Sequence, residues 1–447
     1  MPRKKQDLGL HPCIVPGVAY LHALQTCVRE EYMSDMSLLL SISNHFDTVV
    51  RDPVWGDIHF DDSLADLIES SPLRLLDGIR QLGPVAYVYP GATHTRRLHS
   101  LGVYYVARKL IQSLLERGQL SFATPTGLRS FLVAALCHDL GHFPYAHSLK
   151  ELPLTPHEVL AAELVLQDPL RDAILRCSAD PEQVAAIIDS DRTNPNDRET
   201  LLYRKILSGV LDPDKIDYLS RDAYFCGVPY GIQDSEFILR RLYVVDDELG
   251  VDEKSEMSIE AVLFSKYQMY RAVYWHPTVR SGTAMVKKSI LMGLAHGIIN
   301  SDSLYGLDDA AFSKLLIGAH GEEFKPAKMA HAGKFYPLIA EIPVDAANPV
   351  HHDLSNLNKR LEAEASLALA ANVAETAIVV DIPEPISFES KIKVKTDQGW
   401  RDFSERSIIF RAAELEALQA SLRKIRVFAD PSVNPTLIKG LAKELLA

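Results

Sequence analysis

Two long stretches of the sequence place apolar residues at helical spacing and end at a glycine, and they constrain the fold most strongly. Residues 98–118 read "LHSLGVYYVARKLIQSLLERG", and residues 124–141 read "TPTGLRSFLVAALCHDLG". Apolar residues three and four positions apart form one face of a helix, and glycine is typical of the position after its last turn. We therefore expect two core helices, with the polar run "CHDLGHFPYAH" (137–147) where the second one ends.

The rest of the chain predicts a mainly α fold with a short hairpin and an α+β C-terminal region. Residues 211–227, "LDPDKIDYLSRDAYFCG", place Asp212 as an N-cap and Pro213 at the first helical position. Residues 237–253 predict a helix end followed by a hairpin with its turn near "DDELG". Residues 375–394 and 423–433 predict strands, because β-branched residues dominate between prolines and charges.

Three regions are expected from this pattern. Residues 1–45 look like an N-terminal extension with an amphipathic helix around 18–32, and residues 46–300 form a helical domain. Residues 301–447 form an α+β region with an oligomerisation or regulatory role. At 447 residues and 47% hydrophobic content, the chain is long enough to bury a substantial core.

Charge and cysteine content narrow the functional classes. A net charge of −12 argues against strong nucleic-acid binding, so a polyanionic ligand needs a local basic pocket. The five cysteines are scattered and contain no CxxC pair, which fits a reducing cytoplasm rather than a disulfide framework. No apolar run approaches the roughly 18 residues of a membrane span, so we expect no membrane association and a cytoplasmic location.

The adjacent pair His138 and Asp139 predicts a metal site. Neighbours on a regular helix point about 100° apart, so both side chains reach one ion easily only where the helix ends. Two ligands are too few, and the others must come from distant segments: His99 on the earlier helix and Asp214 in the first turn of the later one. Two neutral and two anionic ligands suit a divalent ion such as Mn, Fe, Zn or Mg.

Each of these residues also has a simpler explanation. An isolated His-Asp pair is more often an exposed polar pair or an aspartate-oriented histidine. Asp212 and Asp214 would equally complement a helix N-terminus, where negative charge is stabilised. His142 and His147 would be ordinary surface histidines beside a loop. The metal hypothesis depends on all these residues occurring together.

Four stretches resemble the HD-domain deoxynucleoside triphosphate triphosphohydrolases, which include bacterial dNTPases and the mammalian SAM-and-HD-domain dNTPase. They are "YVYPGATHTRRLHSLGV" (87–103), "CHDLGHFPYAH" (137–147), "HEVLAAE" (157–163) and "SGVLDPDKIDYLSRDAYFCGVPYG" (208–231). The resemblance covers roughly residues 50–290. It implies a helical HD domain that holds one divalent metal per subunit. It also implies water attack on the α-phosphorus of a dNTP, which releases a deoxynucleoside and inorganic triphosphate.

The resemblance assigns roles residue by residue. The family's metal ligands fall on His99, His138, Asp139 and Asp214, and its active-site histidines on His142, His147 and His157. Phosphate contacts fall on Arg96 and Lys215, whose chemistry suits that task. The deoxyribose is lined by residues matching Gln81, Leu82, Tyr218, Asp222 and Tyr274. Of these, Asp222 accepts a hydrogen bond from the 3′-hydroxyl, and the apolar and aromatic wall excludes a 2′-hydroxyl.

Three positions depart from the family pattern. The arginine that recognises an activating guanine nucleotide in the mammalian enzyme is replaced by Asp77, which cannot donate a hydrogen-bond fork. A phosphate-contacting arginine becomes Lys266, which keeps the charge but loses bidentate geometry. An acid three residues after His147 becomes Lys150, and we expect Glu151 to take its place in orienting a catalytic histidine.

Three functions remain open. The first is a dNTP triphosphohydrolase, and the second is another HD phosphohydrolase acting on a monophosphate or cyclic nucleotide. The third is a nucleotide-binding regulator with weak or lost catalysis. The extended "LDPDKIDYLSRD" and "QLG" matches favour the first function, and the complete ligand set argues against the third. By the same resemblance we expect at least a dimer, with a nucleotide effector at a subunit contact.

Overall fold

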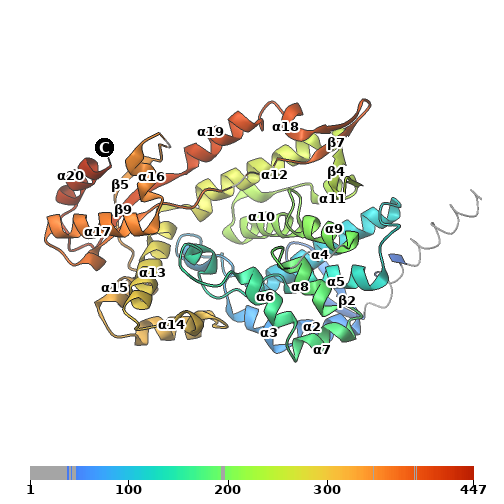
Figure 1. Ribbon diagram of the computed structural model, residues 1–447, viewed down its shortest axis with the longest axis horizontal. Coiled ribbons are helices and arrows are strands. Elements are labelled where there is room, and N and C mark those ends of the chain that lie inside the picture. The colour runs from blue at the N-terminus through green and yellow to red at the C-terminus, as the bar shows by residue number, and fades with distance from the viewer. Residues whose placement is uncertain are drawn as a thin grey trace, which may run out of the picture.

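The computed structural model describes residues 38, 39, 42 and 47–446, apart from 193–196, 346, 387 and 389. The helix predicted around 18–32 lies outside them. The chain forms a helical lobe (47–274) and a C-terminal lobe (277–381 and 424–446), and a return segment (382–423) runs back over the helical lobe. Figure 1 shows the helical lobe on the right, the C-terminal lobe on the left, and the return segment crossing between them.

The helical lobe carries short strands at two places and otherwise consists of helices and loops. Its elements are β1 (Thr48–Asp52), β2 (Gly56–Phe60), α2 (Asp62–Ile68), α3 (Ser71–Leu75), α4 (Arg96–Glu116), α5 (Pro125–Cys137), α6 (His157–Val165), α7 (Leu170–Arg176), α8 (Pro181–Ile188), α9 (Arg198–Leu207), α10 (Pro213–Cys226), α11 (Ser235–Leu239), β3 (Leu242–Val245), β4 (Glu248–Asp252) and α12 (Glu256–Met269). A π-helical turn, Tyr270–Tyr274, follows α12.

The C-terminal lobe and the return segment complete the fold. The lobe contains α13 (Pro277–Ala295), α14 (Asp309–Gly318), α15 (Lys325–His331), β5 (Leu338–Pro343), α16 (Pro349–Leu354), α17 (Leu357–Ala371), β6 (Ile378–Asp381), β9 (Lys424–Ala429) and α20 (Pro435–Leu445). The return segment contains β7 (Lys393–Thr396), β8 (Gly399–Asp402), α18 (Phe403–Arg406) and α19 (Ala412–Leu422).

The predicted helix boundaries are confirmed by their capping residues. Helix α4 begins after Thr95, whose side chain accepts from Leu98 N, and the chain turns at Gly118 with φ +64°. Helix α10 begins after Asp212, whose side chain accepts from Lys215 N, and ends at Gly227 with φ +68°. These are the hydrogen-bonding and left-handed positions that Asp and Gly favour.

Gly141 acts differently from the predicted helix stop. Helix α5 already ends at Cys137, and Gly141 lies in the turn that follows. A Cβ on Gly141 would stand 2.0 Å from the carbonyl oxygen of His157. Glycine is therefore required here because helix α6 packs directly against this turn.

The sheets explain how the return segment joins the two lobes. The predicted hairpin is β3–β4, with positive φ at Asp246 and Asp247 in its turn. Strand β4 also pairs in parallel with β7, which gives the four-stranded order β3-β4-β7-β8. The predicted C-terminal strands are β6, β7 and β9, and β9 is the central strand of the three-stranded sheet β5-β9-β6. The β1–β2 hairpin was not predicted.

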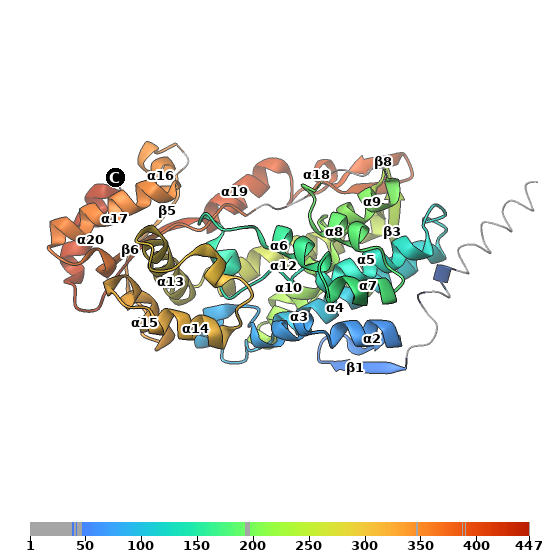
Figure 2. The same ribbon diagram turned by 60° about the horizontal axis from the view of Figure 1, so that its bottom comes forward.

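The hydrophobic cores do not follow the predicted division at residue 300. Helix α13 begins before that boundary but packs with α15 and β6 of the C-terminal lobe. Return-segment residues such as Phe388, Val394 and Phe403 are buried in the core of the helical lobe. The chain therefore enters the second lobe near residue 277 and later comes back (Figure 2).

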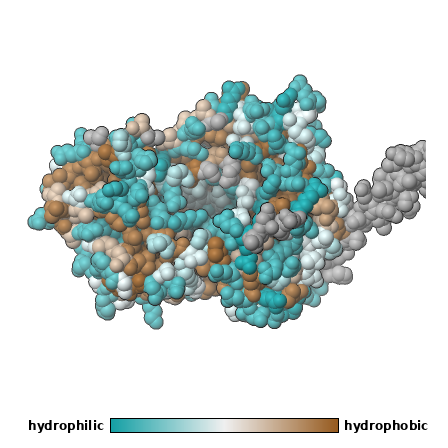
Figure 3. All heavy atoms as spheres, in the orientation of Figure 1, coloured by the Kyte–Doolittle hydropathy of each residue, from teal (hydrophilic) through white to brown (hydrophobic). Residues whose placement is uncertain are grey.

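Within the described part of the chain, every helix is too short or too polar to cross a bilayer. In the view of Figure 3 the surface is largely hydrophilic, with apolar residues gathered mainly over the C-terminal lobe.

Candidate metal centre and substrate cavity

Three helices bring the four predicted metal ligands together. His99 lies in the first turn of α4, His138 caps the end of α5 with Asp139 next to it, and Asp214 is the second residue of α10. Helix α4 packs against both α5 and α10. The approach to α10 is close because α4 has Gly102 there, where a Cβ would stand 1.8 Å from an oxygen of Asp217.

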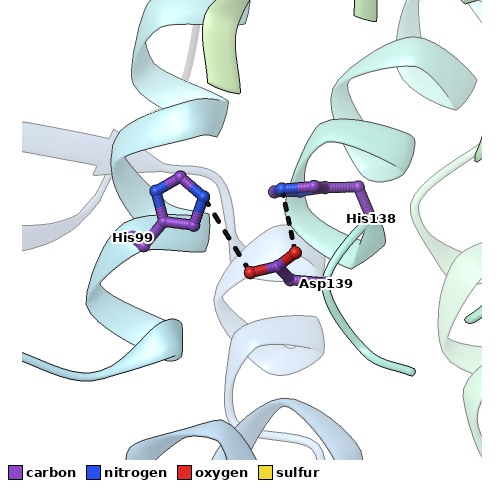
Figure 4. Close-up of side chains that lie close together, drawn as sticks. All are labelled: His99, His138 and Asp139. Carbon is purple, nitrogen blue, oxygen red and sulfur yellow. Dashed lines mark ion pairs between the residues drawn. The ribbon is translucent and has the colours of Figure 1, made fainter. Parts of the chain in front are cut away.

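The ligand atoms converge on one small volume. His99 Nε2 lies 2.9 Å from Asp214 Oδ1 and 3.9 Å from Asp139 Oδ2. His138 Nε2 lies 3.4 Å from Asp139 Oδ1 and 3.8 Å from Asp214 Oδ1. The Asp139 carboxylate sits between the two imidazole rings, which point toward it (Figure 4). The structure thus brings all four predicted ligands together.

The donor set fits a divalent cation. His138 Nδ1 lies 2.9 Å from the carbonyl oxygen of Ala135. The ring proton is therefore on Nδ1, and Nε2 keeps a free lone pair that can bind a metal ion. That Nε2 is buried and has no hydrogen-bond partner among the described residues, although buried polar atoms normally have one. Two imidazoles and two carboxylates form a set that Mn, Fe, Zn and Mg all accept.

A buried aspartate that the sequence analysis missed orients His99. Asp217 Oδ2 lies 2.7 Å from His99 Nδ1, and its carboxylate is also bound by Arg221 at 2.9 and 2.8 Å and by Trp55 Nε1 at 2.5 Å. Arg221 in turn contacts Asp52 at 2.8 Å. A carboxylate behind a ligating histidine fixes its tautomer and raises its basicity. Asp217 stands three residues after Asp214, so the helical spacing alone could have identified it.

The electrostatics of the site favour positive charge at its centre. Burial disfavours the charged form of His99, but the hydrogen bonds to Asp214 and Asp217 outweigh burial and raise its pKa to about 10. Burial likewise opposes ionisation of Asp139, yet His142, His138 and Arg96 hold the pKa of Asp139 well below its usual value. Carboxylates that remain ionised in a buried site attract a proton or a metal ion.

The three predicted active-site histidines form a cluster beside Asp139. His142 Nδ1 lies 3.1 Å from Asp139 Oδ1, and His142 Nε2 lies 3.1 Å from His147 Nε2. The ring centroids of His142 and His157 are 3.7 Å apart. Burial and the charge of Arg96 lower the pKa of His142 to about 4, and burial with neighbouring cationic charge lowers the pKa of His147 and His157 as well. All three imidazoles are therefore neutral near pH 7.

A cavity of about 720 Å³ opens beside these groups. It is lined by every residue predicted to contact the sugar: Gln81, Leu82, Tyr218, Asp222 and Tyr274. Asp222 accepts a hydrogen bond from the Tyr274 hydroxyl at 2.6 Å. The π-helical turn directs both Tyr270 and Tyr274 to the cavity. Tyr270 packs against the hydrophobic core and also borders the cavity.

The predicted phosphate-binding cations line the same cavity. Arg96 is buried and its Nη1 lies 2.7 Å from Asp139 Oδ2. Lys215 Nζ lies 2.6 Å from Asp212 Oδ2 and 2.7 Å from the carbonyl oxygen of Gly209. Lys266 is buried at the cavity wall, with its Nζ 5.6 Å from the centroid of the Phe388 ring.

The structure gives Glu151 different partners from those we predicted. Among the described residues its carboxylate binds Lys287 of α13 and Arg360 of α17 instead of a histidine. The preceding loop packs against the C-terminal lobe through Phe143 and Leu149. Glu151 lines the same cavity as His147 and His157, but its two ion pairs tie the loop that carries His147 to the C-terminal lobe.

Comparisons with known proteins agree with this geometry. The HD domain profile matches residues 96–222, and the HD associated region profile matches residues 233–447. Uncharacterized protein MJ1154 of Methanocaldococcus jannaschii is 30% identical over 390 residues, which cover 85% of this chain and 79% of that protein. The deoxynucleoside triphosphate triphosphohydrolase SAMHD1 of Homo sapiens is 27% identical over 282 residues, which cover 56% of this chain and 45% of that protein.

A solved structure extends the likeness over most of the fold. A hypothetical protein from Aquifex aeolicus superposes with a TM-score of 0.67 at 26% identity, covering 89% of this chain and 99% of that one. The alignment spans less than half of the mammalian triphosphohydrolase, whereas the Aquifex chain is matched almost end to end.

Proposed function

Because this chain belongs to the HD-domain family of phosphohydrolases, we propose that it hydrolyses deoxynucleoside triphosphates to deoxynucleosides and inorganic triphosphate. One observation carries the proposal. The four metal ligands, His147 and His157 of the histidine cluster, the cations Arg96, Lys215 and Lys266 and the predicted sugar wall all line a single cavity. A monophosphate enzyme would not need a row of cations and a sugar wall in the same cavity.

The residues divide the work between binding and proton transfer. His99, His138, Asp139 and Asp214 would hold one divalent ion. Such an ion, when bound, polarises a phosphoryl oxygen and lowers the pKa of a water molecule. Arg96, Lys215 and Lys266 neutralise the triphosphate, and Tyr218 and Tyr274 pack against the deoxyribose. In the reaction the water oxygen joins the α-phosphorus, the bond to the 5′-oxygen breaks, and that oxygen takes up a proton.

The histidine cluster supplies that proton. The imidazoles of His142, His147 and His157 are neutral before the substrate binds, so they do not balance the charge of the triphosphate. Once the anion is bound, its negative charge raises their pKa. A histidine with a raised pKa becomes a general acid near neutral pH. The contact between His142 and His147 lets a proton move from beside Asp139 toward the cavity.

Product analysis tests the proposal. Purified protein is incubated with each dNTP and GTP, singly and mixed, with Mn or Mg, and the products are separated by ion-exchange chromatography beside an Asp139→Ala control. We expect deoxynucleoside and intact triphosphate from the wild type alone. Release of orthophosphate from nucleoside monophosphates, or no turnover under any condition despite bound metal, would contradict it.

Assembly, regulation and location belong to the same proposal. We expect at least a dimer in the cytoplasm, with a nucleotide effector at a subunit contact. Among the described residues Asp77 lies 3.1 Å from Arg74, so guanine-nucleotide activation by an arginine at this position is not expected. A monomeric mass in light scattering would exclude the dimer, and the mixed-nucleotide assay would reveal any activator.

A further inference from the structure

His94 is a buried histidine that the predicted site did not include. It lies in the loop before α4, and its ring stacks on Phe225 near the end of α10 with centroids 4.6 Å apart. Gly91 allows this contact, because a Cβ there would stand 2.4 Å from the carbonyl oxygen of Phe225. The loop is thus pressed onto α10, and the imidazole reaches the back of the cavity wall.

The ring of His94 holds one side of the Asp222 carboxylate. His94 Nε2 lies 2.8 Å from Asp222 Oδ1, and the Tyr274 hydroxyl donates to Asp222 Oδ2 at 2.6 Å. Asp222 is 2% exposed yet lines the cavity. His94 lies in a loop, Asp222 in a helix and Tyr274 in the π-helical turn. The two hydrogen bonds that join them therefore hold three separate segments together.

The main chain of His94 also supports the opposite side of the cavity. Its carbonyl oxygen accepts from Gln81 N at 3.0 Å, and Gln81 lines the cavity. His94 therefore touches two predicted sugar contacts without lining the cavity itself. Its Nδ1 is buried, and the part of the chain that the structure describes offers it no hydrogen-bond partner. A ring kept for packing alone would be better served by an apolar side chain, because an unpartnered buried nitrogen is destabilising.

We propose that His94 is a positioning residue that fixes Asp222 and thereby makes the cavity select nucleotides carrying a 3′-hydroxyl. This inference rests on the proposed function for the identity of the ligand. A carboxylate offers about four acceptor positions, and His94 and Tyr274 occupy one on each oxygen. The remaining lone pairs are held in a fixed direction and need a donor. A ligand that lacks the hydroxyl leaves them buried and unpaired, which is how polar sites reject deoxygenated analogues.

The test compares kcat/KM for thymidine triphosphate and its 2′,3′-dideoxy analogue. The variants are His94→Leu, which removes the donor, and His94→Gln, which keeps an N–H near the position of Nε2. His351→Leu is the matched control, since His351 is a buried histidine of the C-terminal lobe with both nitrogens hydrogen-bonded. We expect a preference of about 100-fold or more in the wild type and in the control, in line with sites built around a hydroxyl.

The variants should separate positioning from folding. His94→Leu should reduce the preference to less than about tenfold, mainly by raising KM for the 3′-hydroxyl substrate, and His94→Gln should recover most of it. A His94→Leu protein that folds and keeps the full preference would overturn the inference and leave the proposed function intact. Equal loss in His94→Leu and His351→Leu would overturn it too, because it would indicate a general effect on stability.

A binding measurement keeps the inference testable if the wild type hydrolyses no dNTP, an outcome that would refute the proposed function. Trp275 lines the cavity and reports on it by fluorescence. Titration with thymidine and 3′-deoxythymidine should then show tighter binding of thymidine by the wild type and equal binding by His94→Leu. Absence of this preference in the wild type would overturn the inference.

Discussion

Replacing Asp217 with asparagine tests whether the carboxylate behind His99 sets metal affinity. The carboxylate accepts from His99, twice from Arg221 and once from Trp55. An asparagine can accept on one atom only, so its amide group faces two donors, His99 Nδ1–H and Arg221 Nε–H. Each lost hydrogen bond to a charged group is worth about 1.5–3 kcal/mol. Two such losses agree with the roughly 3–5 kcal/mol measured when one partner of a buried ion pair is removed.

In Asp217→Asn, metal affinity and the free energy of unfolding should both fall, and the two can be measured separately. With the wrong partner behind it, His99 loses its preferred tautomer, and loss of such a partner typically weakens metal binding about 10–100-fold. We expect this weakening for Mn in calorimetric titrations of Asp217→Asn. Urea unfolding of the metal-free protein should show a free energy of unfolding lower by about 3–5 kcal/mol.

Asp52→Asn is the matched control. Asp52 is buried and binds the other side of Arg221 at 2.8 Å, and among the described residues His99 pairs with Asp217 and not with Asp52. We expect this variant to lose about 1.5–3 kcal/mol of stability and to keep wild-type affinity for Mn. Equal weakening of Mn binding in both variants, or none in Asp217→Asn, would refute the argument that Asp217 acts through the tautomer of His99.

Three further predictions concern the metal ion, the turn at Gly141, and Glu199, a buried carboxylate of α9 that accepts hydrogen bonds from Thr124 and Tyr203. Chelation with EDTA should lower the thermal unfolding midpoint of the wild type but not of Asp139→Ala, because an ion at 1,000 times its Kd stabilises the folded protein by about 4 kcal/mol. Equal shifts of the midpoint in the two proteins would contradict this. Gly141→Ala should destabilise by about 1–3 kcal/mol, because its Cβ would stand 2.0 Å from the His157 carbonyl oxygen, and an unchanged midpoint would be inconsistent with that packing. Burial raises the pKa of Glu199, so its contribution to stability is full below its unfolded pKa and falls as pH rises. Glu199→Gln should therefore gain stability relative to the wild type as the pH rises above the ordinary pKa of a glutamate, as measured by urea unfolding. A stability difference that stays constant with pH would argue against it.

The sequence predicted helix boundaries best, because a capping residue acts on the backbone of its own turn. Gly118 after α4 and Asp212 as the N-cap of α10 follow from the local pattern, because capping and helical periodicity are local. Two residues that were missed, His94 and Lys287, act on partners far away in the sequence. His94 and Asp222 are 128 positions apart, and Lys287 and Glu151 are 136 apart. Nothing in the local pattern of either segment indicates the partner.

The C-terminal region shows the same limit, because its strands pair with segments that lie far away in the sequence. A strand such as β7 is recognisable from its β-branched residues, but the strand with which it pairs cannot be identified from the local sequence. Because β7 pairs in parallel with β4, the chain must leave the hairpin, build the C-terminal lobe and return before the sheet is complete. On the way, α13 and α17 supply Lys287 and Arg360 to Glu151, four residues beyond His147. The second lobe therefore supports the candidate site, since Lys287 and Arg360 hold the loop that carries His147.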